Sequence, residues 1–352
     1  MPSSTSNSSG HFERALPEKR LGKLFGGAVI VVLAFLVALE IHARANGIKP
    51  NRALSMAFWQ NHRFRLESQP EDATVLLGAS RITFGLDHDA WEKVTGARPY
   101  NLGLHGASCL PMLHDYAENT LMRGKVICAF SGGFTFANER IPFSQRISKA
   151  VNDINKNRYS FALRTQELTG KALQARFAVL NPFLYSPIEV LREHLRFETR
   201  ENEVAWFHTP FAVYHTEENQ DIFIDGLADP YCLKQWDIMH STALQYMERF
   251  EPRDLESVIK QIQGDVKTIH DRGGEVVFVR FPVSRFFREW EAERFPRQEY
   301  WDQVIARTRC RGFHYLDHTL TKDLFPPDGS HLVPEDAKVF TEVLARFVLE
   351  RN

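Results

Sequence analysis

The sequence predicts an α/β protein, a three-layer αβα sandwich in which helices cover both faces of a mainly parallel sheet of five strands. Short apolar runs, each ended by glycine or another small residue, alternate along the chain with amphipathic segments of helical period. The runs are continuously apolar, as expected of parallel strands that are buried on both faces. With 43% hydrophobic and 12% aromatic residues, a chain of 352 residues can bury a core of this kind.

Five apolar runs are expected to be the strands, at residues 74–77, 100–102, 125–130, 275–281 and 314–316. Five amphipathic stretches are expected to be helices, at residues 87–95, 110–122, 255–271, 298–307 and 334–349. The last helix has clear start signals. Pro334 suits a first helical turn, and Glu335 and Asp336 complement the positive end of the helix dipole.

The α/β pattern extends over residues 73–352 and is interrupted at about residues 138–252, between the third and fourth strands. That stretch is rich in aromatic and charged residues and too long for a structureless loop, so we expect a large, mostly helical insertion or lid. Residues 1–20 are rich in Ser and Asn and are expected to be a disordered cytoplasmic tail. Residues 44–72 form a polar connector, whose short aromatic stretch packs on the domain or sits at a bilayer interface.

Residues 24–39 carry no charge and follow three basic residues between positions 19 and 23, which indicates membrane insertion. We expect a single transmembrane helix over residues 21–43 that anchors the chain. The preceding basic residues favour a cytoplasmic N-terminus and an extracytoplasmic domain, periplasmic or at the cell surface. Two alternatives stay open: Ala43-Arg44-Ala45 could be a signal-peptidase site, and a run this short could be a buried core helix.

Composition and cysteine spacing exclude several classes of function. Lys+Arg 43 against Asp+Glu 44 leaves a net charge of -1, so there is no basic field that would attract nucleic acid. The four cysteines and the scattered histidines show no metal-ligand or CxxC spacing, so no metal or other cofactor is expected. Export would permit a disulfide, for which Cys232 and Cys310 are the least implausible pair, although a sequence does not set connectivity.

The first candidate functional residue is Ser80, in the sequence VLLGASR at residues 75–81. It is expected at the C-terminal end of the first strand, the edge of an open α/β sheet at which ligands bind. The small residues Gly78 and Ala79 would let a substrate approach the backbone closely. By itself, a turn of this composition is also a common way to end a strand.

The second candidate is the sequence PPDGSHL at residues 326–332, in a loop just before the last helix. A carboxylate three residues before a histidine, in a turn that contains glycine, can bring Asp328 to the imidazole of His331. Asp328 would then fix the imidazole tautomer and stabilise the imidazolium that forms when His331 takes a proton from Ser80. The alternative is a capping loop with a solvent-exposed histidine.

Together these segments resemble the motifs of the SGNH (GDSL-type) hydrolase and acyltransferase superfamily, in its membrane-anchored envelope subtype. GAS at residues 78–80 resembles the first block, Gly-Asp-Ser; Asn101-Leu102-Gly103 resembles the second block, and Asp328-x-x-His331 the last. The resemblance implies an SGNH, flavodoxin-like sandwich apart from the insertion. It also implies that Ser80 is the nucleophile of a triad with Asp328 and His331, and that the N–H groups of Ser80 and Gly103 bind an oxyanion.

The sequence departs from this family pattern in two places. Ala79 replaces the aspartate of the first block, which is not the catalytic acid. The third block, Gly-x-Asn-Asp, is absent after the third strand, where the chain reads FSGGF at residues 130–134. The backbone N–H of Gly132 or Gly133, or the side chain of Asn138, is a candidate third oxyanion donor.

Three other residues are candidates for substrate binding. Arg81 stands beside the nucleophile, Arg280 lies at the end of the fourth strand, and His105 closely follows Gly103. Either arginine could hold an anionic or hydroxyl-rich substrate. For Arg81, a surface ion pair with Asp87 is an equal alternative.

These residues predict acyl-ester chemistry at the cell envelope, in which Ser80 forms an acyl-enzyme with an acyl donor. Water resolves it in an esterase, and a hydroxyl of a surface glycan resolves it in an O-acyltransferase. Similar single-pass proteins act beside a multi-pass membrane-bound O-acyltransferase, which is an analogy of architecture.

The missing third block motivates the alternative of a non-catalytic envelope protein that binds glycan or organises an assembly. An unrelated flavodoxin-like binding domain has less support, because no Gly-rich phosphate loop follows the first strand.

Overall fold

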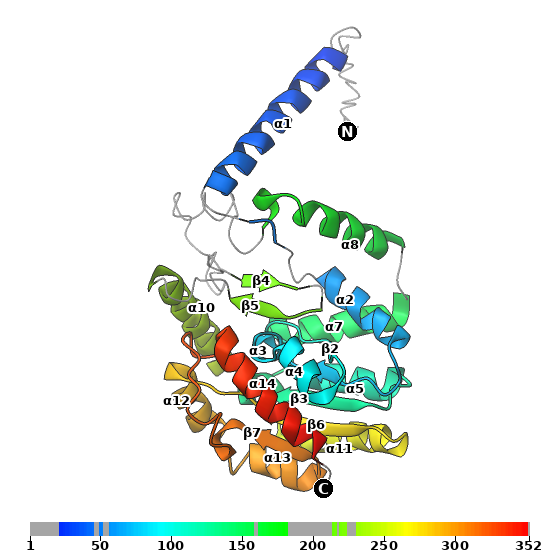
Figure 1. The fold of residues 1–352 in the computed structure, drawn as a ribbon, viewed down its shortest axis with the longest axis vertical. Coiled ribbons are helices and arrows are strands. Elements are labelled where there is room, and N and C mark those ends of the chain that lie inside the picture. Colours follow the sequence, from blue (N-terminus) through cyan, green and yellow to red (C-terminus); the bar gives the residue numbers. More distant parts are fainter. Residues whose placement is uncertain are drawn as a thin grey trace, which may run out of the picture.

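A computed structural model of the chain describes residues 21–45, 49–51, 56–157, 161–181, 213–216, 218–223 and 230–350. Within these residues it has a mixed α/β architecture, with thirteen α-helices and one five-stranded sheet (Figure 1). The expected tail, residues 1–20, lies outside the described residues, as does the aromatic-rich part of the insertion at residues 182–212.

The sheet consists of β1 (Val75–Leu77), β2 (Tyr100–Asn101), β3 (Lys125–Phe130), β6 (Glu275–Arg280) and β7 (Arg311–His314). Its spatial order is β2-β1-β3-β6-β7, and every neighbouring pair is parallel. Each parallel pair requires a crossover that returns the chain to the start of the next strand. The C-terminal ends of all five strands therefore lie at one edge, and the predicted five-stranded parallel sheet is confirmed.

Both faces of the sheet are buried under helices. One face packs against α5 (Cys109–Asn119), α11 (Leu255–Asp271) and α13 (Trp301–Thr308), and the other against α4 (His88–Thr95) and α14 (Pro334–Leu349). The strand residues alternate between these layers, with Val126, Cys128, Val276 and Phe278 on the first face and Ile127, Ala129, Val277 and Val279 on the second. Two buried faces explain why the strands are continuously apolar in sequence.

Local capping signals set the helix boundaries closely. The predicted helices at residues 255–271 and 334–349 are confirmed without a shift. Asp254 accepts a hydrogen bond from the Ser257 N–H before α11, and Asp87 caps α4 in the same way through the Ala90 N–H. The helices expected at 110–122 and 298–307 instead end at Asn119 and begin at Trp301.

The last strand is displaced from its expected place at residues 314–316. It covers Arg311–His314, and Tyr315–Asp317 form a 3₁₀ helix. The Nδ1 atom of His314 accepts a hydrogen bond from the Leu316 N–H at 3.2 Å, which turns the chain after the strand. The prediction was wrong because the apolar run continues past the point at which pairing with β6 stops.

The described parts of the insertion are mostly helical, as expected. They contain α7 (Pro142–Asn157), α8 (Phe161–Gln174) and α10 (Pro230–Glu248), together with an antiparallel hairpin of β4 (Val213–His215) and β5 (Asp221–Phe223). Before the insertion lies the short helix α6 (Gly132–Thr135), and after β6 lies α12 (Arg285–Arg294). Each of these last two helices begins shortly after the C-terminal end of a strand, α6 after β3 and α12 after β6, and the two helices contact each other.

The expected connector contributes to the core through α2 (Met56–Arg65), which is followed by a 3₁₀ turn at Leu66–Ser68. Trp59 is buried, and its Nε1 donates to the Leu102 carbonyl at 2.8 Å. Arg63 and Asp115 form a buried ion pair between α2 and α5. The aromatic stretch thus packs on the domain, and residues 56–68 are part of it.

Helix α1 (Leu21–Ala45) projects from one end of the domain (Figure 1). It is 25 residues long, and its most apolar stretch has a mean hydropathy of 2.7 with none of it buried. The alternative of a buried core helix is therefore wrong. By length and composition α1 fits both a membrane anchor and a signal sequence.

The disulfide considered for Cys232 and Cys310 is not formed, because Cys310 is a buried free thiol. Cys109 and Cys128 are also free and buried, and burial raises the pKa of Cys109 to about 12. The side chain of Cys232 lies outside the described residues. The three described cysteines therefore act as small apolar core residues.

Gly78, two residues before Ser80, is predicted to be intolerant of a side chain. Its φ is +155°, and an added Cβ would lie 2.5 Å from the Cβ of Ala129 on β3. Gly78→Ala should destabilise the fold by about 1–3 kcal/mol through overpacking. Gly264→Ala is the matched control, because it lies on an exposed face inside α11 with no atom within 4 Å and should stabilise by about 0.5–1 kcal/mol. Urea unfolding of the full-length chain in detergent micelles measures both, and equal effects would contradict the assignment.

Candidate active site

Ser80 lies at the C-terminal edge of the sheet. β1 ends at Leu77, the backbone turns through Gly78 and Ala79, and Ser80 is the first residue of α3 (Ser80–Gly85). The remainder of α3 is buried, whereas Ser80 is partly exposed. Amide groups in the first turn of a helix have no intrahelical acceptor, so both the hydroxyl and the N–H of Ser80 are placed for contact with a ligand.

The loop before α14 brings Asp328 and His331 to this serine. Ser80 Oγ lies 2.7 Å from His331 Nε2, and His331 Nδ1 lies 2.6 Å from Asp328 Oδ2. The two distances define the tautomer, in which Nδ1–H donates to the carboxylate and Nε2 accepts from the serine hydroxyl. The geometry joins a serine hydroxyl, an imidazole and a carboxylate, and the serine and the histidine are 251 residues apart in sequence.

Asp328 is fully buried, yet its environment keeps it ionised. Burial acts to raise the pKa of the carboxyl. The attraction and hydrogen bond of His331 outweigh burial, and they hold the pKa of Asp328 well below its usual range. Its Oδ1 also accepts hydrogen bonds from the Ser330 N–H at 2.9 Å and the His331 N–H at 2.8 Å. A carboxylate bound in this way is a strong acceptor for the His331 imidazole.

Arg81 and Arg280 lie behind the triad and share the carboxylate of Glu291 from α12. Arg81 Nη1 is 2.8 Å from Glu291 Oε1, and Arg280 Nη2 contacts Glu291 Oε2. Arg81 Nε also donates to Ser330 Oγ at 3.0 Å, next to the triad loop. Only 4% of Arg81 and 8% of Arg280 are exposed, so both belong to the framework of the site and offer little surface to a substrate.

The surface ion pair considered for Arg81 and Asp87 is wrong, because Arg81 is buried against Glu291 and Asp87 caps α4. Burial lowers the pKa of Arg81 to about 10 and that of Arg280 to about 9. Both values stay well above neutral pH. The two guanidinium groups therefore carry their charge in the interior, where Glu291 balances part of it.

Gly103 lies beside α3. Its loop is held by a side chain of the loop itself and by the hairpin of β4 and β5. An added Cβ on Gly103 would lie 2.6 Å from a methyl carbon of Ile82, which shows how closely the loop approaches α3. The Gly103 N–H donates to Asn101 Oδ1 at 2.8 Å. Asn219, between β4 and β5, donates to the carbonyls of Asn101 and Gly103 at 2.9 and 2.7 Å. The N–H expected as an oxyanion donor is thus bonded within the loop.

His105 belongs to a second buried group of polar side chains next to the triad. Its Nε2 lies 2.6 Å from Asp221 Oδ2, and Asp221 Oδ1 lies 2.8 Å from His215 Nδ1. The ring of Phe84 connects this group to the triad, because its centroid is 5.7 Å from His105 and 4.5 Å from His331. His105 therefore lines the same region, but the hairpin already occupies its Nε2.

The candidates after β3 lie in different surroundings. An added Cβ on Gly132 would lie 2.5 Å from the Phe295 ring, so Gly132 packs on the segment after α12. Both polar atoms of the Asn138 side chain are engaged, since its Nδ2 donates to the Glu251 carbonyl before α11 at 3.0 Å and its Oδ1 accepts from the Arg140 N–H. Ser131, which the sequence did not single out, is closer to the site network, because Arg81 Nη1 donates to its Oγ at 3.4 Å.

Helix α10 of the insertion supplies two further neighbours of the triad that sequence reasoning missed. The ring centroid of Trp236 lies 5.2 Å from that of His331, and the ring of His240 lies 5.8 Å from it. Both side chains are buried, and Asp237 of the same helix pairs with Arg285 at 2.6 Å. The available signal was the spacing of Trp236 and His240, which places both on one helix face.

Two groups of described side chains bring three possible metal ligands within 4.8 Å of one another. They are His240, Asp328 and His331, and His114, Glu118 and Asp265. In each group a histidine Nδ1 lies only 2.6–2.7 Å from a carboxylate oxygen, which is the distance of a shared proton. A hydrogen bond therefore accounts for the close approach of His331 and Asp328 in the first group and of His114 and Asp265 in the second.

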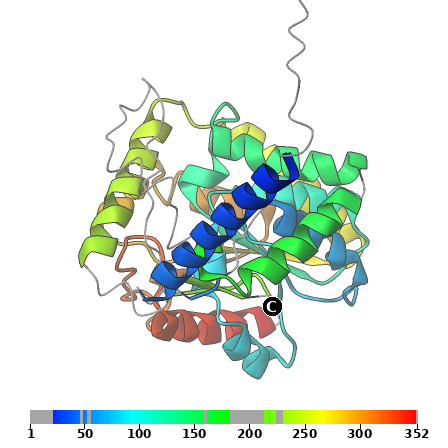
Figure 2. The ribbon, with the colours of Figure 1, turned by 90° about the horizontal axis from the view of Figure 1, so that it is seen from above.

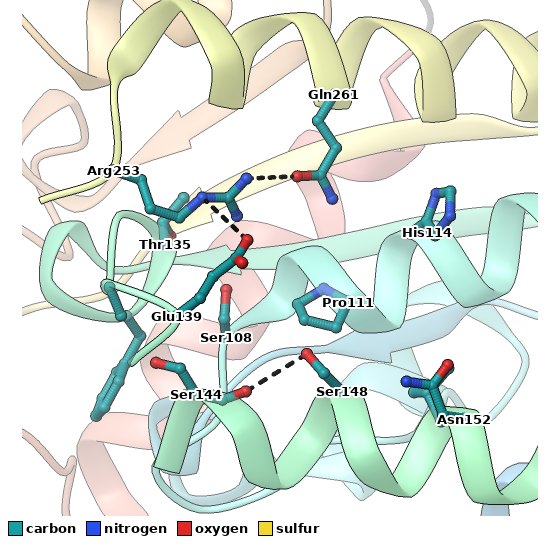
Figure 3. A pocket seen from close by; sticks show the side chains of 13 residues that line it. Ser108, Pro111, His114, Thr135, Glu139, Ser144, Ser148, Asn152, Arg253 and Gln261 are labelled. Carbon is teal, nitrogen blue, oxygen red and sulfur yellow. Dashed lines mark hydrogen bonds and ion pairs between the residues drawn. The ribbon is translucent and has the colours of Figure 1, made fainter. Parts of the chain in front are cut away.

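A pocket of about 240 Å³ lies between α5, α6, α7 and the start of α11 (Figure 3). Arg253 crosses it, with Nη2 donating to Gln261 at 3.0 Å and Nε 3.8 Å from Glu139. Ser148 and His114 are also among its lining residues. None of the residues expected in the site lines this pocket, so it is separate from the serine constellation.

His240 should make the stability of the fold depend on pH. Burial lowers its pKa to about 4 from an ordinary value of 6.5, so between these values the unfolded chain binds a proton that the folded chain does not. The charge of Asp328 acts to raise the pKa of His240, whereas those of His331 and Arg81 act to lower it, so these effects partly offset one another. Stability should therefore be complete above pH 6.5 and fall as the pH decreases towards 4.

His240→Gln should flatten this dependence by up to about 1.4 kcal/mol per pH unit, the value for one proton. Urea unfolding of both chains at pH 7, 6 and 5 measures the slope. His62 and His314 also have pKa values lowered to about 3, mainly by burial, so part of the slope should remain in the variant. An unchanged slope would contradict a neutral, buried His240.

Comparison with known proteins adds no assignment to this geometry. No protein-family model matches the chain, and a search of curated proteins finds no match. The function proposed below therefore rests on the arrangement of Ser80, His331 and Asp328.

Proposed function

We propose that the chain is a serine-dependent acyl-ester hydrolase or O-acyltransferase of the SGNH type, which acts on a cell-envelope or exported glycan. One observation carries the proposal: Ser80, His331 and Asp328 form a continuous hydrogen-bonded relay at the C-terminal edge of a parallel sheet. In chain order the strands of the sheet lie as 2-1-3-4-5, the flavodoxin-like order, in which ligands bind at this edge. This order supports the proposed SGNH sandwich.

In the proposed mechanism, His331 Nε2 takes the proton of Ser80 as Oγ attacks the carbonyl carbon of the acyl donor. The imidazolium that forms is stabilised by ionised Asp328. When the carbon–oxygen bond to the leaving group breaks, His331 returns the proton to the departing oxygen and an acyl-enzyme remains. Water or a glycan hydroxyl then loses a proton to His331 and attacks the acyl carbon; the bond between this carbon and Ser80 Oγ breaks, and His331 returns the proton to Oγ.

The oxyanion of each tetrahedral intermediate would bind at the first turn of α3. The Ser80 N–H is one donor, and the Gly103 N–H is the second. Because Gly103 now donates to Asn101 Oδ1, the oxyanion must take the place of that side-chain oxygen. Asn101 Nδ2 already lies 3.3 Å from His88 Nε2, a contact that can hold the amide while its oxygen is displaced.

The membrane side of the proposal rests on α1, whose length and apolarity suit a single-pass anchor. With the domain outside the cytoplasm, surface glycans become the accessible hydroxyl-rich substrates. A multi-pass acyltransferase of the same membrane is the proposed supplier of activated acyl groups. This partner follows from the analogy of layout and from the need of a transferase for an acyl donor.

A second candidate function is a non-catalytic protein that binds glycan or organises a modification assembly. The observation in its favour is that the expected oxyanion donors are engaged elsewhere. The Gly103 N–H is bonded to Asn101, and the Asn138 side chain is bonded to Glu251 and Arg140. On this alternative the relay is a structural hydrogen-bond network.

A fluorophosphonate probe should separate the two functions. The full-length chain in detergent micelles should label stoichiometrically, and Ser80→Ala should abolish labelling because Oγ is the nucleophile. Ser148→Ala, which changes a serine of the separate pocket, is the control and should label like the parent. A folded parent chain, shown by circular dichroism, that takes up no probe would favour the binding protein.

The triad assignment predicts a large loss of turnover in Asp328→Asn. The amide cannot stabilise the imidazolium and favours the wrong tautomer of His331, so hydrolysis of an aryl acetate should fall by about 10⁴-fold. His331→Gln should be similarly impaired, and the double variant no worse than the single ones, because the residues act as a unit. Turnover that survives Asp328→Asn would refute the assignment. Added oligosaccharide should yield an acylated product if the enzyme is a transferase.

A further inference from the structure

The outward face of α8 is apolar and carries no charge among its described residues. Phe161 is 84% exposed, Leu168 63% and Leu173 47%. The other exposed residues of this helix are Ala162, Thr165, Gln166, Thr169 and Ala172. The turn that follows continues the surface with Phe177 and Leu180, which are 41% and 42% exposed, and it also exposes Ala175 and one charged residue, Arg176. We refer to these exposed residues from Phe161 to Leu180 as the α8 surface.

The distribution of charged and apolar side chains on α8 differs from that on a helix that faces water. Among the charged residues of α8, Glu167 faces the domain, is 9% exposed, and lies 3.6 Å from Arg65 of α2, whereas the side chain of Arg164 lies outside the described residues. Lys171 is half-buried. A helix covering a soluble domain buries its apolar side and exposes its charges, whereas α8 buries Glu167 and exposes its large apolar side chains. A contiguous apolar surface of this kind marks contact with a membrane or another protein.

The end of α8 is fixed to the end of α1. Glu40 accepts hydrogen bonds from the Ala178 and Val179 N–H groups at 3.1 and 2.9 Å, and Arg44 donates to the Arg176 carbonyl at 2.8 Å. Glu40 is the residue directly after the charge-free segment 24–39. These contacts place the α8 surface at the level at which the apolar part of α1 ends.

We propose that the α8 surface lies on the lipid bilayer into which α1 inserts, as an interfacial helix parallel to the membrane plane. Figure 1 shows α8 on the side of the domain from which α1 projects, and Figure 2, seen from above, again shows the two helices beside each other. An interfacial helix buries its apolar side at the headgroup boundary, where aromatic residues such as Phe161 and Phe177 are favoured. The proposal is independent of any chemistry at Ser80.

Lipid is favoured over the other possible occupants by two observations. Helix α1 does not cover the α8 surface, because the apolar stretch of α1 is itself entirely exposed. The two apolar surfaces are also continuous through Glu40 and the Ala178–Leu180 turn, so a bilayer around α1 reaches α8 without a gap. Thr165, Gln166 and Thr169 suit the polar side of the headgroup region.

The experiment uses the full-length chain in nanodiscs of phosphatidylcholine that contain a phosphatidylcholine with a diazirine-bearing acyl chain. After illumination, mass spectrometry should find lipid adducts in peptides from α1 and in those covering residues 161–180. The double variant Leu168→Glu, Leu173→Glu should lose several-fold of the α8 adducts and keep those of α1. Leu121→Glu is the control: this leucine is 84% exposed just before β3, at the opposite edge of the sheet from Ser80, and should change neither yield.

Adducts confined to α1 would overturn the proposal, as would cross-linking of the α8 peptides to a second copy of the chain. Purification of a chain cleaved near residue 45 would also overturn it, since α1 would then not hold the helix at the bilayer. Because all substituted residues are exposed, the variants should fold, and circular dichroism of each nanodisc sample checks this. Fluorophosphonate labelling of the same samples reports the serine site separately.

Discussion

A buried negative charge, that of Asp328, organises the site. The loop that carries it supplies two backbone donors and one imidazole to the carboxylate, and these groups replace the water that burial removes. The loop keeps its shape through the neighbouring chain after β6. Ser284 donates from its N–H to the Gly329 carbonyl, and Gly329 adopts a φ of +90° that suits glycine. Rigid support of this kind keeps His331 in line with Ser80.

The charges behind Asp328 form a balanced group. Arg81 and Arg280 contribute two positive charges, and Glu291 and Asp328 contribute two negative ones, with Arg81 under the influence of both carboxylates. Such a group is stable only when all members are present, because the removal of one leaves an uncompensated charge in the interior. The arginine that follows Ser80 therefore has a structural role in the interior. Its charge holds α3, α12 and the triad loop together at the edge of the sheet.

The sequence predicted those features whose signals are local. Pro334 marks a helix start, the amphipathic period marks the helix at residues 255–271, and the continuous apolar runs mark buried strands, so these elements appear where expected. The aspartate and histidine of the triad are three residues apart, and their turn could be recognised directly. The end of β7 was missed because it depends on where pairing with β6 stops.

The surroundings of the site could not be predicted, because they depend on contacts that are remote in sequence. The partner of Arg81 is Glu291, which is 210 positions away and is one acidic residue among many in a charged helix. Asn219 reaches the Gly103 loop across 116 residues, from an insertion whose fold has no family pattern in the sequence. A short motif shows which side chains can react, but it contains no information on which distant groups neutralise or cover them.

The same hairpin connects the chain after α1 to the Gly103 loop by a series of short contacts. The His215 N–H donates to Asn51 Oδ1 at 3.3 Å, and His215 and His105 share Asp221 between them. Asn219 then holds the loop that carries Gly103. All of these hydrogen bonds except the part-buried one of His105 join buried groups, so a displacement of the hairpin would break bonds that water cannot replace. The position of Gly103 beside α3 therefore depends on Asn51, in the segment that follows α1, although the two residues are 52 positions apart in sequence.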